Sequence, residues 1–263
     1  MTAASAEAPT HIGWVPVPDH ISRDAHRTPA GKARLGPLLA VCGLAGGAGA
    51  TTLSYLIALA AARQSSEPVL VADTGGPSGG LAACAGVEVP RSLGELAEQL
   101  AAGVTLAGGI YGTGHNGLRV LATGPEFSSP RADEQVRRLL VDAREAHGLT
   151  VIDCGTLTRE AEKAAAAAAT HVAWMLTATA HGVSRGRRVL EAAPRMAGKE
   201  LIVARNDVRQ ANAPLRELRR IAVERRAPLV LVPHLTGLDA DKLAAEADAA
   251  QVPVQAILGA LRR

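Results

Sequence analysis

A glycine-rich stretch between two apolar runs constrains this chain more than any other feature. The first run, residues 37–44, has the composition of a buried strand, and the second, which begins after Thr51 and Thr52, predicts a helix over residues 51–63. Glycines between the runs let backbone N–H groups curl around an anion, which would also lie at the positive end of the helix. These glycines are Gly43, Gly46, Gly47 and Gly49. The stretch therefore predicts a strand, an anion-binding loop and a helix.

The same stretch admits a second interpretation, a transmembrane helix. Residues 36–62 carry no charge and are long enough to cross a bilayer, and Gly43 and Gly47 have the spacing of helix contacts in membranes. Four glycines within seven residues interrupt such a helix, so the loop is the favoured interpretation.

The composition fits a globular α/β domain. A length of 263 residues suits one doubly wound domain with an extension and leaves no room for a second full domain. The net charge of +3 permits contact with nucleic acid or acidic lipid without requiring either. The three cysteines have no C-x-x-C spacing, which is typical of reduced core residues in a cytosolic protein.

The order of the elements predicts the fold. Residues 1–35 show no sustained apolar period and are assigned to a disordered or loosely docked extension, and residues 36–263 to a single domain. Strands alternate with helices across that domain, which predicts a doubly wound, mainly parallel sheet with helices on both faces. Further helices are expected at residues 91–102, 132–146, 158–169, 183–193 and 212–226, and strands at 118–121, 149–153, 171–179, 200–206 and 228–234.

Two of the expected strands end in an aspartate. Asp73 closes the strand after the first helix, and Asp153 closes the strand at 149–153. Ligands in parallel α/β folds gather at the carboxyl ends of the strands, so both carboxylates are expected beside the glycine loop.

The loop A-G-G-A-G-A-T-T, residues 45–52, resembles the deviant Walker A loop K-G-G-x-G-K-[ST]-[ST] of the ParA/MinD family of P-loop ATPases. Loops of the form G-G-A-G-A-[ST]-T-L resemble most closely those of the CpaE/TadZ and septum-site-determining (Ssd) branch. The resemblance implies a site for ATP or ADP with Mg²⁺, or a vestigial site that takes no cofactor. It assigns nucleotide binding to Gly46, Gly47, Ala48, Gly49, Ala50, Thr51, Thr52 and Asn206, with Arg205 as a second candidate beside Asn206, and Mg²⁺ to Thr51, Asp73 and Asp153.

Three groups that the family uses in hydrolysis are absent. Both lysines of the loop are alanines, Ala45 and Ala50, and the second acid of the motif D-x-D-x-x-x-G-x-L is Gly75. Removing one donor that stabilises the transition state slows catalysis by about a hundred- to a thousandfold. The sequence therefore predicts a pseudo-ATPase, with weak or vestigial nucleotide binding and no meaningful turnover.

The resemblance implies a cytoplasmic, dimer-forming scaffold or regulator. Its protein partners would belong to a division, pilus or secretion machinery, and recruitment would be to the membrane or the nucleoid. The alternative is a ParA-like partition ATPase that binds ATP and nonspecific DNA. A third interpretation is an active ATPase or kinase that borrows a basic residue in trans.

Two surface features bear on these alternatives. DNA contact would use two basic clusters, chiefly Arg187, Arg188, Arg219 and Arg220. The first cluster consists of Arg185, Arg187 and Arg188, and the second of Arg216, Arg219, Arg220, Arg225 and Arg226. Glu217 and Glu224 interrupt the second cluster, which favours solvated helix faces. The final segment, residues 253–263, is amphipathic, and packing on the domain is favoured over contact with a membrane.

Overall fold

The computed structural model describes residues 35–74, 80–86, 111–112, 117–121, 132–196, 198–206, 212–235 and 240–262. Residues 1–34 of the expected extension at 1–35, the expected helix at 91–102 and Gly75 lie outside the described residues. The strands are β1 (Leu38–Gly43), β2 (Val69–Asp73), β3 (Tyr111–Gly112), β4 (Leu118–Leu121), β5 (Leu149–Asp153), β6 (His171–Thr177), β7 (Glu200–Asn206) and β8 (Leu229–Pro233).

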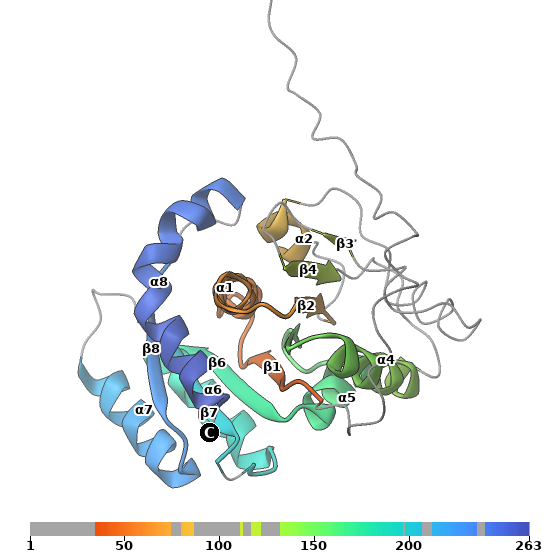
Figure 1. Ribbon diagram of the computed structural model, residues 1–263. Helices are drawn as coiled ribbons and strands as arrows, with labels where there is room; N and C mark the ends of the chain where they lie inside the picture. The colour runs from red at the N-terminus through yellow and green to blue at the C-terminus, as the bar shows by residue number, and fades with distance from the viewer. Residues whose placement is uncertain are drawn as a thin grey trace, which may run out of the picture. The chain divides into compact units, whose positions relative to one another are not determined.

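These strands form one eight-stranded sheet in the order β3-β4-β2-β5-β1-β6-β7-β8 (Figure 1). Every pairing from β4 to β8 is parallel, and only the two-residue β3 runs antiparallel to its neighbour β4. The expected doubly wound, mainly parallel α/β fold is therefore confirmed.

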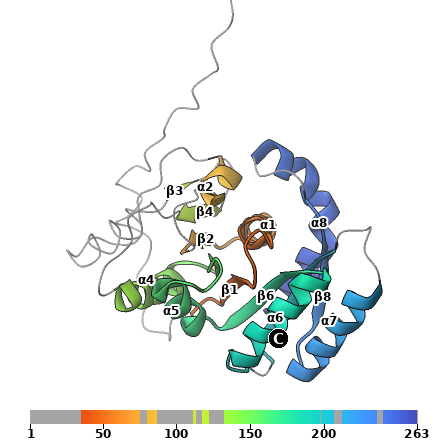
Figure 2. The ribbon, with the colours of Figure 1, turned by 180° about the vertical axis from the view of Figure 1, so that it is seen from behind.

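Helices cover both faces of this sheet. They are α1 (Ala50–Gln64), α2 (Gly80–Ala85), α4 (Ala132–Ala146), α5 (Glu160–Ala168), α6 (Ala180–Ala192), α7 (Asn212–Arg225) and α8 (Ala240–Ala260). One buried cluster joins the sheet to α1, α2 and α8, and a second joins it to α4, α5, α6 and α7. The two opposite views show how these helices are arranged around the sheet (Figures 1 and 2).

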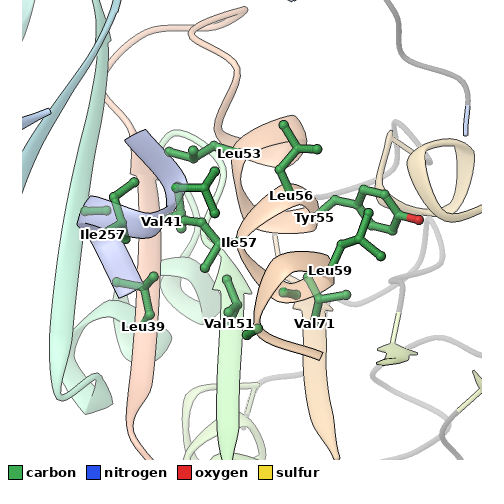
Figure 3. Close-up of a cluster of buried hydrophobic side chains, with 14 of the residues drawn as sticks. Leu39, Val41, Leu53, Tyr55, Leu56, Ile57, Leu59, Val71, Val151 and Ile257 are labelled. Carbon is green, nitrogen blue, oxygen red and sulfur yellow. The ribbon is translucent and has the colours of Figure 1, made fainter. Parts of the chain in front are cut away.

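The alternation of side chains along β1 explains why its sequence is apolar throughout. Leu39 and Val41 pack in the α1 cluster, where Figure 3 shows Val41 beside Ile57 of α1 and Ile257 of α8. Leu38 and Ala40 face the opposite cluster. A strand buried on both faces has no solvent-facing position, so it shows no polar alternation.

The glycine loop lies where the direction of winding changes. β1 occupies the middle of the sheet between β5 and β6. The chain runs from β1 to β2 on the β5 side, whereas after β5 it continues through β6, β7 and β8 on the other side. Open α/β sheets bind ligands at such a point, outside the carboxyl ends of the strands.

The transmembrane interpretation of residues 36–62 is wrong, because these residues form a strand, a loop and a helix. Among the described residues, no helix has the length and apolar character needed to span a bilayer.

The last helix is longer than the amphipathic segment at residues 253–263. It begins at Ala240, and Pro253 lies inside it. The residues before the proline are rich in alanine, which favours a helix strongly enough for it to continue through Pro253. Val254, Ile257 and Leu258 are buried, so the amphipathic face of α8 packs on the domain as favoured.

Candidate functional site

The glycine loop is anchored at its start by the neighbouring strands. The N–H of Gly43 donates to the carbonyl oxygen of Gly155 at 2.7 Å, just beyond β5, and the N–H of Leu44 donates to Met175 of β6 at 2.8 Å. The loop therefore leaves the sheet between the carboxyl ends of β5 and β6.

Two glycines give the loop its shape. Gly47 has a φ of 71° and Gly49 a φ of 98°, in the left-handed region that residues with a Cβ avoid. The N–H of Ala48 closes a turn onto the carbonyl oxygen of Ala45 at 3.3 Å, and α1 begins directly after Gly49. Within the described part of the chain, the N–H groups of Gly46 and Gly47 have no backbone acceptor. The loop thus presents backbone donors beside a helix N-terminus, as the sequence predicted.

Thr51 and Asp153 meet at this loop. The Thr51 hydroxyl, in the first turn of α1, donates to Oδ2 of Asp153, and the N–H of Gly155 donates to Oδ1 at 3.0 Å. Asp153 is 2 % exposed, and burial raises the pKa of its carboxyl group, with the two donors opposing that rise. The carboxylate is therefore held in a defined position at a cost in desolvation.

Asp73 lies beside Asp153, because β2 and β5 pair in register at these two residues. Asp73 is 3 % exposed. Thr74 fastens the two strand ends, since its N–H and its hydroxyl both donate to the carbonyl oxygen of Asp153, at 2.8 and 2.9 Å. The expected convergence of the two aspartates on the glycine loop is what the structure describes.

These residues suit Mg²⁺ as far as their chemistry goes. Among the described residues there is no group of three or more His, Cys, Asp or Glu side chains that could hold a metal. Mg²⁺ does not require such a cage, because it keeps several waters and uses one or two carboxylates together with phosphate oxygens. Thr51, Asp73 and Asp153 offer the hard oxygen ligands that this mode of binding uses.

Thr52 has a different neighbour from Thr51. Its side chain interacts with the thiol of Cys84 in α2. Burial, with Asp153 and Asp73 nearby, raises the pKa of that thiol to about 11. All three cysteines are free and buried, as expected of reduced core residues.

Asn206 is the last residue of β7 and is partly exposed. Its neighbour Arg205 reaches the glycine loop: Nη1 donates to the carbonyl oxygen of Gly47 at 2.7 Å. Arg185 of α6 makes a similar contact, in which Nε donates to the carbonyl oxygen of Leu44 at 3.1 Å. Sequence reasoning named Arg205 only as a candidate beside Asn206, and it named Arg185 only within a basic cluster. No local pattern marks either residue as a partner of the loop.

Some arginines of the basic clusters form ion pairs with glutamates. Arg187 makes ion pairs with Glu217 at 2.8 Å and Glu224 at 3.4 Å, and Arg220 pairs with Glu217 at 2.8 Å. Arg188 and Arg219 are exposed.

Arg225 is not a surface cation, contrary to the sequence interpretation. It is 7 % exposed, and its Nε and Nη2 each donate to the Glu200 carboxylate at 2.7 Å. Nη1 donates to the carbonyl oxygen of Leu190 at 2.6 Å and Nη2 to that of Pro194 at 2.9 Å. The guanidinium therefore ties the end of α7 to β7 and to the end of α6.

No protein-family model and no curated protein matches this chain significantly. Solved structures do. A ParA-family ATPase from Chlorobium tepidum superposes with a TM-score of 0.65 at 13 % identity, covering 84 % of this chain and 92 % of the other. The MinC:MinD cell division protein complex of Aquifex aeolicus contains a chain with a TM-score of 0.66 at 14 % identity, covering 85 % and 96 %.

A third structure is cobyrinic acid a,c-diamide synthase from Mycobacterium smegmatis with a bound ATP analogue and magnesium. Its TM-score is 0.59 at 19 % identity, and 81 % of this chain and 93 % of the other are covered. Identities this low show the fold and do not by themselves assign an activity. The chain has the fold of the ParA and MinD ATPases.

Proposed function

We propose that this chain is a ParA/MinD-like pseudo-ATPase of the CpaE/Ssd kind, which acts as a positioning or regulatory scaffold. One observation carries the proposal. The loop at residues 43–52 keeps the left-handed glycines, the helix N-terminus and the Thr51–Asp153 contact of a phosphate site, while both positions of the family's lysines are alanines.

The retained parts support weak binding of ATP or ADP. Backbone N–H groups at Gly46, Gly47 and the start of α1 would surround the phosphates, and the helix end favours negative charge. Thr51, Asp73 and Asp153 would hold Mg²⁺, which neutralises charge on the phosphate oxygens when it is bound. The side chain of Thr52 interacts with Cys84, so its contribution to a nucleotide would come from its backbone.

The missing parts argue against turnover. Phosphoryl transfer gains its rate from positioning and from cations that neutralise the transition state. Ala45 and Ala50 supply neither charge, and Gly75 supplies no acid to orient the attacking water. A site that binds a nucleotide without consuming it suits a regulated scaffold, in which occupancy selects a conformation.

A scaffold of this kind would be cytoplasmic and would form a homodimer with protein partners in a division, pilus or secretion machinery. The fold that it shares with a chain of the MinC:MinD complex supports that choice, and recruitment to the membrane or nucleoid would follow from the partner. Size-exclusion chromatography with light scattering, with and without ADP or ATP, tests the dimer. A monomer under every condition would contradict this part of the proposal.

Calorimetry and an ATPase assay test the site. We expect weak, Mg²⁺-dependent binding of ATP and ADP that Thr51→Ala abolishes, with no hydrolysis above background. Ser184→Ala, which removes an exposed hydroxyl from α6, is the matched control and should bind as the native chain does. Hydrolysis at the rate of an ordinary ParA, lost in Thr51→Ala, would refute the pseudo-ATPase.

The partition alternative has weaker support. Of the four arginines expected to bind DNA, Arg187 and Arg220 form ion pairs with a glutamate, so Arg188 and Arg219 remain as candidates for contact with DNA. In a gel-shift assay, changing Arg219 and Arg220 together to glutamine should not alter the mobility of duplex DNA mixed with the protein. A salt-dependent shift that is present in the native chain and lost in this double variant would favour partition instead.

A further inference from the structure

The glycine loop lacks its own cation, yet two guanidinium groups from other elements are bound to it. Arg205 projects from the carboxyl end of β7, two strands away from β1, and donates to Gly47. Arg185 projects from the first half of α6 and donates to Leu44. Two independent elements therefore deliver positive charge to one short loop, at its first residue and near its middle.

Both arginines are held so that their side chains reach the loop. The backbone of Arg205 is fixed in the sheet, where its carbonyl oxygen accepts from the N–H of Ala178 at 2.8 Å. Arg185 lies on a helix packed close to the loop: a Cβ added to the next residue, Gly186, would stand 3.4 Å from a methyl carbon of Leu44. α6 therefore packs against the first residue after β1, which places Arg185 beside the loop.

We propose that Arg205, assisted by Arg185, supplies the positive charge of the nucleotide site in place of the absent lysine, and that the site selects ligands by their phosphates. Because Arg205 acts through its hydrogen bond to the carbonyl oxygen of Gly47, it is a positioning residue. This inference rests on the nucleotide-binding function proposed above.

Two physical effects support this assignment. A guanidinium stays ionised at every physiological pH, so it places a permanent positive charge against the loop. Donation to the carbonyl oxygen of Gly47 also polarises that peptide unit, whose N–H belongs to Ala48, and so strengthens the hydrogen bond from Ala48 to the carbonyl oxygen of Ala45 that closes the turn of the loop. The charge favours a di- or triphosphate over an uncharged nucleoside, and the strengthened turn holds the loop in the shape that presents the N–H groups of Gly46 and Gly47.

Binding of ADP, inorganic pyrophosphate and adenosine to the full-length chain, measured by calorimetry with Mg²⁺ at low and high salt, tests the inference. Arg205→Gln should weaken ADP and pyrophosphate by about tenfold at low salt, and the loss should shrink at high salt because added ions screen the missing charge. Adenosine should change less than twofold. Arg205→Lys keeps the charge and should recover part of the affinity.

Lys199→Gln is the matched control. It removes a positive charge just before the opposite end of β7, about 20 Å away along the strand, and should leave all three ligands unaffected. Circular dichroism confirms that each variant folds, and if Arg205→Gln does not fold, Arg185→Gln carries the same prediction with a smaller loss.

The outcomes separate the two proposals. ADP binding that is equal in the native chain and in Arg205→Gln would overturn the role of Arg205 and leave the nucleotide site standing. An equal loss at both salt concentrations, or an equal loss for adenosine, would also overturn it, because a loosened loop explains that result without charge. Pyrophosphate binding without ADP binding would overturn the nucleotide site alone, and a native chain that binds no probe would overturn both.

Discussion

Restoring one lysine to the loop gives the sharpest test of why the site is weak. Ala50 is 8 % exposed and is the first residue of α1, directly before Thr51. In Ala50→Lys, the new ammonium would reach the phosphates that the loop amides surround. A hydrogen bond to a charged group contributes about 1.5–3 kcal/mol. That free energy corresponds to roughly ten- to a hundred-and-fifty-fold tighter binding of ADP and ATP.

The same substitution should cost stability in the absence of ligand. The Ala50 methyl group lies at the end of β1, 3.6 Å from the position that a Cβ at Gly43 would take. The longer lysine side chain therefore has to extend away from β1, through the loop. We expect unfolding to become easier by about 1 kcal/mol, as for most substitutions at crowded positions. Hydrolysis should stay at background, since Ala45 and Gly75 are unchanged.

Calorimetry with ADP and Mg²⁺ measures the gain, and differential scanning calorimetry measures the loss. Ala213→Lys adds the same charge to an exposed position of α7 and controls for a general effect of net charge. Affinity that rises equally in both variants would show that net charge is responsible. No rise in Ala50→Lys would show that the loop does not present phosphates to this position, and the proposed nucleotide site would then be wrong.

Three further results are expected. Burial raises the pKa of Asp153 above its ordinary value of 3.8, so the carboxyl group loses its proton at a lower pH in the unfolded chain than in the folded protein. The free energy of unfolding therefore falls as the pH rises from 3.8 through the pKa of Asp153 in the folded protein. Asp153→Asn should lack this fall and melt about 2–4 °C higher at neutral pH, while losing Mg²⁺-dependent stabilisation by ADP; a lower melting temperature would contradict this. Arg225→Ala strands the buried Glu200 carboxylate and should lower the free energy of unfolding by about 3–5 kcal/mol in urea titrations, whereas a loss under about 1 kcal/mol would mean that the pair is dispensable. Burial raises the pKa of the Cys84 thiol, and a hydrogen bond with Cys42, together with burial, raises the pKa of the Cys154 thiol. A chromogenic disulfide reagent should therefore titrate fewer than one thiol in the native chain and three after unfolding; rapid reaction of the folded chain would show that the thiols are accessible.

The sequence was sufficient for the parts of the site that depend on local pattern. Apolar runs broken by glycines predicted β1, the loop and α1, because a strand buried on both faces and a loop with positive φ each require particular residue types. The meeting of Asp73 and Asp153 followed from the parallel sheet, since each ends its strand and the carboxyl ends share one edge.

Long side chains escaped prediction. Arg185 and Arg225 each look like a surface cation in the sequence, and Arg205 is a nucleotide-binding candidate beside Asn206, because periodicity cannot tell which group a long side chain will reach. Their partners are a loop carbonyl oxygen, a second loop carbonyl oxygen and a buried glutamate, all remote in the chain. Such contacts depend on which strands become neighbours, so they follow from the tertiary fold alone. The same limit applies to Arg187. It forms ion pairs with Glu217 and Glu224 of α7, whereas the sequence alone suggests that its positive charge is available to bind DNA.

The two cation arguments meet in one further experiment. If Arg205 supplies the charge that a lysine at position 50 would supply, the two substitutions must be coupled and not additive. Ala50→Lys should then improve ADP binding more in the Arg205→Gln background than in the native chain. In the Arg205→Gln background the lysine replaces a missing positive charge, whereas in the native chain it adds to a charge that is already present. A double-mutant cycle measured by calorimetry gives this coupling directly. Strict additivity would mean that the lysine does not replace the charge of Arg205, and Arg205 would then stabilise the shape of the loop without acting as its cation.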